Sequence, residues 1–311
     1  MSIELEAPDG VGEIAVGTDL AAEITAVLDL RDGDVVVITS KVISKSEGRV
    51  LPYRTPADRD AAIDSETVRE VARRGPVRIV ENRLGLVMAA AGVDASNLAN
   101  GTLALLPEDP DATARTLREA LLERHGVNVA ILIADTAGRA WRVGQTDIAI
   151  GLAGLDPYEN FEGRVDAYGN ELAVTAPAVA DEIAGAAELA SNKLGARPFI
   201  RVRGLGDRVL PVDTHGDGAR ALQRNAAEDL FALGSRDAVV EALAKSAPWA
   251  PVAIADDLAG AFARCGFAVT AVEPTRVALA VEAPRDLWRA EVVAQVHGWR
   301  PGGTSGEFVA S

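Results

Sequence analysis

The chain of 311 residues is longer than one hydrophobic core usually supports, so we expect two domains, or one large domain with an appendage. Its net charge of −15, from 31 basic and 46 acidic side chains, argues against nucleic-acid and anionic-membrane partners, which require a basic face. The single cysteine, Cys265, leaves no internal disulfide. No secretory signal opens the chain, and no apolar run reaches the roughly 20 residues that span a bilayer, so we expect a cytoplasmic protein.

Helical and extended patterns alternate over residues 1–244 and predict an α/β fold of mixed α+β type. In chain order, we expect a helix over 19–28 capped by Thr18 or Asp19, a strand over 35–39, a polar segment over 41–49, a helix over 57–74 and a strand over 77–80. After these we expect a helix over 111–124, a strand over 129–134, a helix over 175–193, a strand over 199–203, a loop over 210–220 and a helix over 228–233.

The sequence changes character after Lys245, where Pro248-Trp-Ala-Pro is a linker signal. Beyond it we expect a helix, two strands and a second helix, over 255–265, 267–272, 276–282 and 285–296, followed by a mobile tail from Pro301. The predicted domains are therefore residues 1–244 and a small αββα module over 245–311, for which the sequence names no ligand.

Six apolar residues, Val129 to Ala134, lead directly into Asp135 and Thr136. A carboxylate at the end of a buried strand lies where open α/β sheets collect their ligands. Asp135 and Thr136 offer hard oxygen ligands to Mg²⁺ or Mn²⁺. The guanidinium groups of the arginines that follow can form paired hydrogen bonds with a phosphate or a carboxylate. The alternative, a helix-capping aspartate after a core strand, is equally compatible with this segment.

Four apolar runs end in polar clusters, at 39–45, 94–97, 135–136 and 203–204. If their strands are neighbours in one sheet, these clusters converge and supply the carboxylates, lysines and hydroxyls that suit a nucleotide phosphate with a divalent metal. The glycine patterns of P-loop and Rossmann proteins are missing, which disfavours both classes. The three histidines lie far apart in the sequence, which argues against a zinc site.

Two of these clusters leave alternatives open. Lys41 and Lys45 would share one helical face and suit a triphosphate, although a solvated basic turn pairing with Glu47 is the simpler interpretation of that segment. Asp94 and Asp135 would repel each other in a shared site unless a divalent ion lies between them. Two independent helix caps are the alternative to that shared metal.

Five long segments together resemble the coenzyme F420-0:L-glutamate ligases, the F420 gamma-glutamyl ligase family. The order and spacing hold from about residue 10 to 234, and the chain looks most like the actinobacterial type, without its fused nitroreductase-like domain. The segments are Thr39-Ser-Lys-Val-Ile-Ser-Lys-Ser-Glu-Gly-Arg49, Glu81-Asn-Arg-Leu-Gly-Leu-Val-Met-Ala-Ala-Ala-Gly-Val-Asp-Ala-Ser-Asn97, Asp135-Thr-Ala-Gly-Arg-Ala-Trp-Arg142, Asp166-Ala-Tyr-Gly-Asn-Glu-Leu-Ala-Val-Thr175 and Ala180-Asp-Glu-Ile-Ala-Gly-Ala-Ala-Glu-Leu189.

The resemblance implies a set of site residues and a fold. The fold would be that of the F420 gamma-glutamyl ligases, a homodimer with intertwined sheets, here followed by the small C-terminal αββα module. The family's N-terminal loop usually carries Pro-Glu after its glycine, and this chain departs from that pattern. Metal ions would be held by Asp94, Asp135 and Thr136, GTP by Val11, Gly12, Glu13, Ile14, Ser40, Lys45 and Asn97, and the catalytic residues would be Asp94, Asp135 and Lys45.

The implied reaction uses GTP to add L-glutamate, through γ-linkages, to coenzyme F420-0 by way of an acyl phosphate. The implied cofactors are Mg²⁺ or Mn²⁺, two per site, with K⁺ as a further candidate. Chemistry alone suggests that Arg139 and Arg142 hold substrate carboxylates or the phosphodiester, or instead pair structurally with Asp147, Asp166 or Glu171. Two alternatives remain: a ligase of this scaffold with another acidic acceptor, and a non-catalytic nucleotide- and metal-binding partner of an F420-pathway enzyme.

Overall fold

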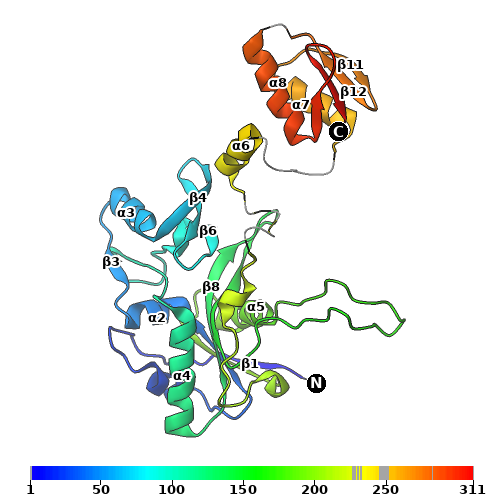
Figure 1. Ribbon diagram of the computed structural model, residues 1–311. Helices are drawn as coiled ribbons and strands as arrows, with labels where there is room; N and C mark the ends of the chain where they lie inside the picture. Colours follow the sequence, from blue (N-terminus) through cyan, green and yellow to red (C-terminus); the bar gives the residue numbers. More distant parts are fainter. Residues whose placement is uncertain are drawn as a thin grey trace. The chain divides into compact units, whose positions relative to one another are not determined.

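The computed structural model describes residues 2–225, 229, 231, 233–244, 252–281 and 283–310 (Figure 1). The chain divides into two compact units, Met1–Asp229 and Leu230–Ser311. The sequence places the domain boundary at 244/245, and residues 245–251 lie outside the described part of the chain. Each unit is therefore described by itself.

A five-stranded mixed sheet forms the centre of the first unit, in the order β1-β10-β2-β8-β9. Only β2 and β8 run parallel to each other, with Val35 opposite Ala130 and Thr39 opposite Ala134. The other neighbours pair antiparallel. The strands are β1 (Glu4–Glu6), β2 (Val35–Thr39), β8 (Ala130–Gly138), β9 (Gln145–Ala153) and β10 (Phe199–Arg203).

Helices cover both faces of this sheet because its central strands are apolar on both sides. Val36 and Ile38 of β2 face a core shared with α1 (Leu20–Val27) and α4 (Pro110–His125). Val35 and Val37 face the opposite core, which is shared with α5 (Val179–Ser191). This alternation along a buried strand follows from the two-residue period of the pleat. The predicted helix cap is confirmed, since the Asp19 side chain accepts from the backbone N–H of Ala22 at 3.2 Å.

A smaller layer over residues 47–108 has its own apolar core around Ile63, Val80 and Leu103. The predicted helix over 57–74 is wrong in its second half, because the chain turns extended after Glu66 and pairs antiparallel with the next strand. This pairing overrides the local helical preference. Helix α2 (Ser40–Ser46) follows β2 and contributes Val42 and Ile43 to the core of the central sheet. The elements of the smaller layer are β3 (Val50–Pro52), α3 (Pro56–Glu66), β4 (Thr67–Arg74), β5 (Val77–Asn82), β6 (Val87–Ala89), the 3-10 helix η1 (Ala90–Gly92) and β7 (Thr102–Ala104).

Between β9 and α5 the chain forms an extended double-stranded arm over residues 157–177, drawn in green in Figure 1. Backbone hydrogen bonds join its two limbs, from Phe161 N to Thr175 O at 3.0 Å and from Leu172 N to Arg164 O at 2.8 Å. The predicted helix over 175–193 therefore starts later, at Val179. Two short 3-10 helices, Gly206–Arg208 and Ala219–Leu222, follow β10.

The second unit has a four-stranded antiparallel sheet, in the order β11-β12-β14-β13. The predicted αββα elements are present, but the tail from Pro301 is not simply mobile, because β13 and β14 pair with each other and bury Trp299 and Phe308. The helix expected over 228–233 is also wrong at its described residues, and α6 starts at Ser235. The elements are α6 (Ser235–Ala244), α7 (Ala255–Arg264), β11 (Val269–Glu273), β12 (Arg276–Leu279), α8 (Pro284–Val296), β13 (Trp299–Pro301) and β14 (Glu307–Ala310).

Across the described residues, none of the helices has both the length and the apolar character that a membrane crossing requires.

Gly151 of β9 lies against the start of α4, and this close approach requires a residue without a side chain. A Cβ atom at this position would stand 2.5 Å from the carbonyl oxygen of Pro110. We expect Gly151→Ala to lower the free energy of unfolding by about 1–3 kcal/mol, because a backbone contact has to shift. Urea unfolding measures the loss, with Gly138→Ala as the control, since a Cβ atom at Gly138 meets nothing within 4 Å.

Candidate active site

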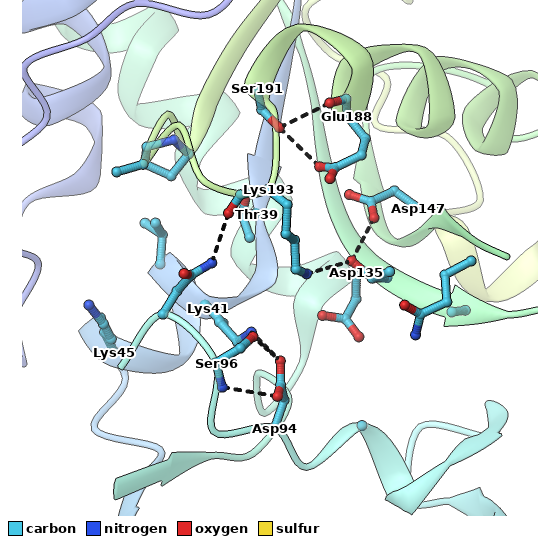
Figure 2. Close-up of a pocket in the computed structure, with 18 of the residues that line it drawn as sticks. Thr39, Lys41, Lys45, Asp94, Ser96, Asp135, Asp147, Glu188, Ser191 and Lys193 are labelled. Carbon is cyan, nitrogen blue, oxygen red and sulfur yellow. Dashed lines mark hydrogen bonds and ion pairs between the residues drawn. The ribbon is translucent and has the colours of Figure 1, made fainter. Parts of the chain in front are cut away.

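A pocket of about 640 Å³ opens at one edge of the central sheet of the first unit. Its walls come from the N-terminal loop, the β2–α2 junction, the segment after β6, β8 with β9, and the chain between α5 and β10 (Figure 2). Of the site residues predicted from the sequence, those that line this pocket are Val11, Gly12, Glu13, Ile14, Lys45, Asp94, Asn97, Asp135 and Thr136.

Strand direction decides which polar clusters meet here. Because β2 and β8 are parallel, the residues after Thr39 and the end of β8 lie at the same edge of the sheet. The expectation that the Arg203-Gly204 cluster joins them is wrong, because β10 runs antiparallel to β2. Arg203 lies at the opposite edge and binds both carboxylate oxygens of Asp34, at 2.7 and 2.6 Å. The start of β10 faces the pocket instead, through Arg197 and Pro198.

Asp135 is a strand residue and not a helix cap, since β8 continues through Gly138 and pairs with β9. The hydroxyl of Ser40 donates to its Oδ1 at 2.6 Å. Ser40 is buried and does not itself line the pocket, so it supports the carboxylate from behind. Burial raises the pKa of Asp135 to about 6, against the opposing effects of the Ser40 hydrogen bond and the nearby Lys41.

Asp94 lies across the pocket, in a turn that no helix follows. Its carboxylate accepts from the backbone N–H of Ser96 at 3.0 Å and from the Ser96 hydroxyl at 2.6 Å. The ammonium group of Lys41 forms an ion pair with the same carboxylate, as Figure 2 shows. Burial acts to raise the pKa of Asp94, but the hydrogen bonds from Lys41 and Ser96 outweigh it and lower the pKa to about 2. Asp94 is therefore ionised at neutral pH.

A third carboxylate, Asp147, was not predicted as a site residue because strand β9 was not predicted. The β8–β9 register places Asp147 opposite Thr136, whose hydroxyl donates to Asp147 Oδ1 at 2.8 Å. Lys193 then donates to the same hydroxyl at 3.3 Å (Figure 2). Asp147 is buried, and this burial raises its pKa. The uninterrupted run of apolar residues and glycine from Ile148 to Leu155 was the available signal for this strand.

Lys41 and Lys45 lie on one face of α2, as their four-residue spacing indicates, and both line the pocket. Lys45 forms an ion pair with Glu13 at 2.7 Å and so connects α2 to the N-terminal loop. The alternative pairing with Glu47 is wrong, because Glu47 accepts instead from the backbone N–H of Glu108 and the hydroxyl of Thr113, at 2.8 and 2.9 Å.

Asn97 has a left-handed backbone, with φ of 55°, and its side chain donates to the carbonyl of Lys193 at 3.4 Å. Two distant segments of the pocket wall, after β6 and after α5, are joined by this contact. Lys193, like Asp147, was not singled out from the sequence as a site residue. It lies in a loop whose place at the pocket depends on the direction of β10.

Arg139 and Arg142 lie at the exposed tip of the β8–β9 hairpin, and neither lines the pocket. Arg139 donates to the carbonyl of Val143 in the same tip at 3.3 Å. Two of the three proposed structural partners are engaged elsewhere: Asp147 accepts from the Thr136 hydroxyl, and Asp166 accepts from the Asn170 side chain at 3.0 Å. A substrate role for the two arginines stays a prediction.

The described residues contain no group of three or more histidine, cysteine or acidic side chains that could hold a metal ion by themselves. What the pocket does present is Asp94 and Asp135 with the Thr136 hydroxyl, close enough for the two carboxylates to affect each other's charge. Lys41, Lys45 and Lys193 line the same pocket. The fold and the site therefore define an α+β protein whose pocket combines carboxylates and ammonium groups at one sheet edge.

Comparisons with known proteins point to one family. The family model described as F420-0:Gamma-glutamyl ligase matches residues 10–204. Similar proteins include the coenzyme F420:L-glutamate ligases of Archaeoglobus fulgidus, 39% identical over 66% of this chain and 89% of the relative, and of Methanopyrus kandleri, 37% identical over 70% and 93%. A third, from Natronomonas pharaonis, is 36% identical over 61% and 81%.

The chain belongs to the F420-0:gamma-glutamyl ligase family. The resemblance drawn from the five sequence segments is thereby confirmed. The match to the family model ends within the first unit, so the second unit, Leu230–Ser311, lies outside it.

Proposed function

We propose that this protein is a GTP-dependent ligase that adds L-glutamate, through γ-linkages, to coenzyme F420-0. Family membership supports the class of reaction. The observation that carries the proposal is that one pocket brings together the N-terminal loop, Lys45, Asp94 and Asp135 although they lie far apart in the sequence. An acid and an amine do not condense unaided in water, so the pocket must also accommodate an activating nucleotide.

The two carboxylates and the Thr136 hydroxyl fit Mg²⁺ or Mn²⁺ bound together with a nucleotide. Such ions are usually held by one or two carboxylates plus substrate phosphates and water, and not by an all-protein cage. The raised pKa of Asp135 supports this, because a desolvated carboxylate lacks a sufficient counter-charge. Bound ions, two per site with K⁺ as a further candidate, would neutralise negative charge on the β- and γ-phosphates.

The protein's own groups would then position the reactants. In the first step, an oxygen of the acceptor carboxylate forms a bond to the γ-phosphorus of GTP, and GDP leaves. In the second, the amine of L-glutamate attacks the acyl carbon, phosphate leaves, and the amine releases a proton. Lys45 is placed to supply a fixed positive charge to the phosphates, and Ser40 keeps Asp135 in orientation through its 2.6 Å hydrogen bond.

Incubation of the protein with F420-0, L-glutamate, GTP and Mn²⁺, followed by mass spectrometry, tests this function. We expect a product heavier by one or more glutamyl units, with one GDP released for each unit. Reactions without GTP, and with ATP in its place, are the controls. Absence of both the glutamylated product and GDP would contradict the proposal.

Calorimetric titration of GTP and Mn²⁺, and the same incubation with other acidic acceptors, separate the two alternatives. GTP and Mn²⁺ binding without product would favour a non-catalytic partner of an F420-pathway enzyme. GDP release that requires an acidic acceptor other than F420-0 would favour a ligase of the same scaffold with a different substrate. The presence of Asp94, Asp135 and Lys45 in one pocket favours catalysis over binding alone.

Divalent-ion affinity should depend on pH through Asp135. Its pKa is raised to about 6, so this carboxyl group takes up a proton as the pH falls through that value, whereas Asp94, at about 2, stays ionised. Because a cation competes with that proton, we expect Mn²⁺ affinity to fall about tenfold per pH unit below pH ~6 and to level off above it. Calorimetric titration of Mn²⁺ across this range measures the effect. An affinity independent of pH would exclude Asp135 as a ligand.

We also propose that the protein is a cytoplasmic homodimer. The arm between β9 and α5 exposes large apolar and aromatic side chains, among them Tyr168 and Val174, each more than nine-tenths exposed. Exposed apolar surface of this kind is typical of an association site. Light scattering should therefore give a mass of about twice the 32.4 kDa of one chain. A monomer at micromolar concentration would contradict this.

A further inference from the structure

Helix α3 carries an arginine, Arg59, into the wall of the pocket. The helix is held firmly at its start by a reciprocal cap, in which the Asp58 carboxylate accepts from the backbone N–H of Thr55 at 2.8 Å. Ala62 and Ile63, three and four residues beyond Arg59, are buried in the core of the smaller layer. Arg59 therefore projects from the packed face of a fixed helix, and it is itself partly buried.

Arg59 differs from the other cations that line the pocket. Each of those has a partner: Lys41 binds Asp94, Lys45 binds Glu13, Lys193 donates to the Thr136 hydroxyl, and Arg197 binds Asp9 at 2.7 Å. Within the described part of the chain, Arg59 makes no hydrogen bond or ion pair. Its guanidinium is therefore available to donate to a ligand bound in the pocket.

The proposed reaction supplies suitable ligands, since both substrates other than GTP carry carboxylates. Lys41 and Lys45 on α2, together with the N-terminal loop, provide the charges suited to the nucleotide phosphates. Arg59 comes from a different wall, where α3 packs on η1. Val93, which shares the apolar core of the smaller layer with Ala62 and Ile63, also lines the pocket. A low-polarity surface strengthens a charged hydrogen bond, and the planar fork of arginine matches a carboxylate through two parallel bonds.

We propose that Arg59 binds a carboxylate of one of the non-nucleotide substrates, either the acceptor or L-glutamate. This inference rests on the proposed function and adds a specificity-determining residue to it. The guanidinium would hold the substrate at the α3 wall of the pocket, while the lysines of α2 hold the nucleotide phosphates. The reacting carboxylate or amine would then be oriented towards the γ-phosphate position. Nucleotide affinity should be independent of Arg59.

Steady-state kinetics of the full chain with Arg59→Ala and Arg59→Lys test this, with each of the three substrates varied in turn. We expect Arg59→Ala to raise the KM for one carboxylate substrate about 10- to 100-fold while the KM for GTP changes less than about twofold. Arg59→Lys should recover only part of the loss, because it keeps the charge without the fork. Which KM rises identifies the acceptor or L-glutamate as the ligand.

The matched control is Arg115→Ala, since Arg115 is a helical arginine that is exposed on α4 and outside the pocket. It should leave all three KM values unchanged. Unchanged KM values for both carboxylate substrates in Arg59→Ala, or a rise confined to GTP, would overturn the inference. Calorimetric titration of L-glutamate and of F420-0 into wild type and Arg59→Ala gives the same comparison without turnover. An inactive wild type would thus overturn the proposed function, while equal binding by the two proteins would overturn only the role of Arg59.

Discussion

Replacing Asp135 by asparagine is expected to lower ligase turnover by about a hundredfold or more while the first unit stays folded. Asparagine has the same shape as aspartate, and its side-chain oxygen can still accept the hydrogen bond from the Ser40 hydroxyl, which is 2.6 Å long in the wild-type protein. It removes the negative charge that lies among Asp94, Asp147 and Lys41. A neutral amide is also less costly to bury than a carboxylate, so no loss of stability is expected.

Mass-spectrometric product formation and Mn²⁺ titration together measure this effect, and both should be reduced. The matched control is Asp181→Asn. Asp181 is likewise a carboxyl group whose pKa is raised by burial, and it accepts from the backbone N–H of Ala149 at 2.9 Å, but it lies on α5 outside the pocket. Asp181→Asn should retain turnover. Full activity of Asp135→Asn would show that the assignment of this carboxylate to the metal is wrong.

Replacing Arg118 by methionine is expected to lower the free energy of unfolding by about 3 kcal/mol or more, the largest loss among the substitutions considered. Arg118 is only 2% exposed, although it lies on α4. Its guanidinium donates to the carbonyl of Val129 before β8 at 2.9 Å, to the Asn128 side chain at 2.8 Å, and to the carbonyls of Leu210 and Pro211 at 2.7 and 2.9 Å. Methionine fills the space but leaves these acceptors buried without a donor.

Urea unfolding of the full chain, followed by a probe of the first unit, measures the change. Arg115→Met on the same helix is the control, since its exposed side chain should alter the free energy of unfolding by no more than about 0.5 kcal/mol. Equal effects of the two substitutions would mean that the loop over 210–215 is not held by Arg118. Turnover at low temperature should survive in both variants, because neither arginine lines the pocket.

Local elements were largely predictable from the sequence. The valine-rich run Val35–Thr39 forms β2 as expected, and the Asp19 cap starts α1, because both patterns depend on residues close together in the chain. The predicted α/β fold of mixed type is confirmed, and so is the family. The GTP, metal and catalytic assignments stay predictions, although the structure brings most of those residues into one pocket.

Long-range pairing was the part that the sequence did not show. Residues 67–74 form β4 and not the end of a helix because β5 offers a partner strand. Strand β9 was missed, and with it the pairing that places Asp147 beside Thr136. A local pattern carries no information about which distant strand will supply hydrogen bonds, so such segments are decided by tertiary contacts.

By itself, the sequence determined the chemistry available to this protein: a carboxylate after a buried apolar run, lysines four residues apart and a second aspartate in another segment. Only the tertiary structure decided which of these groups meet. The parallel β2–β8 pair brings Lys41 and Asp135 to one edge, and the antiparallel β10 removes Arg203 from it and brings Arg197 in. Strand direction has this effect because reversing a strand exchanges the edge at which its ends lie, a choice set by the packing of the whole sheet.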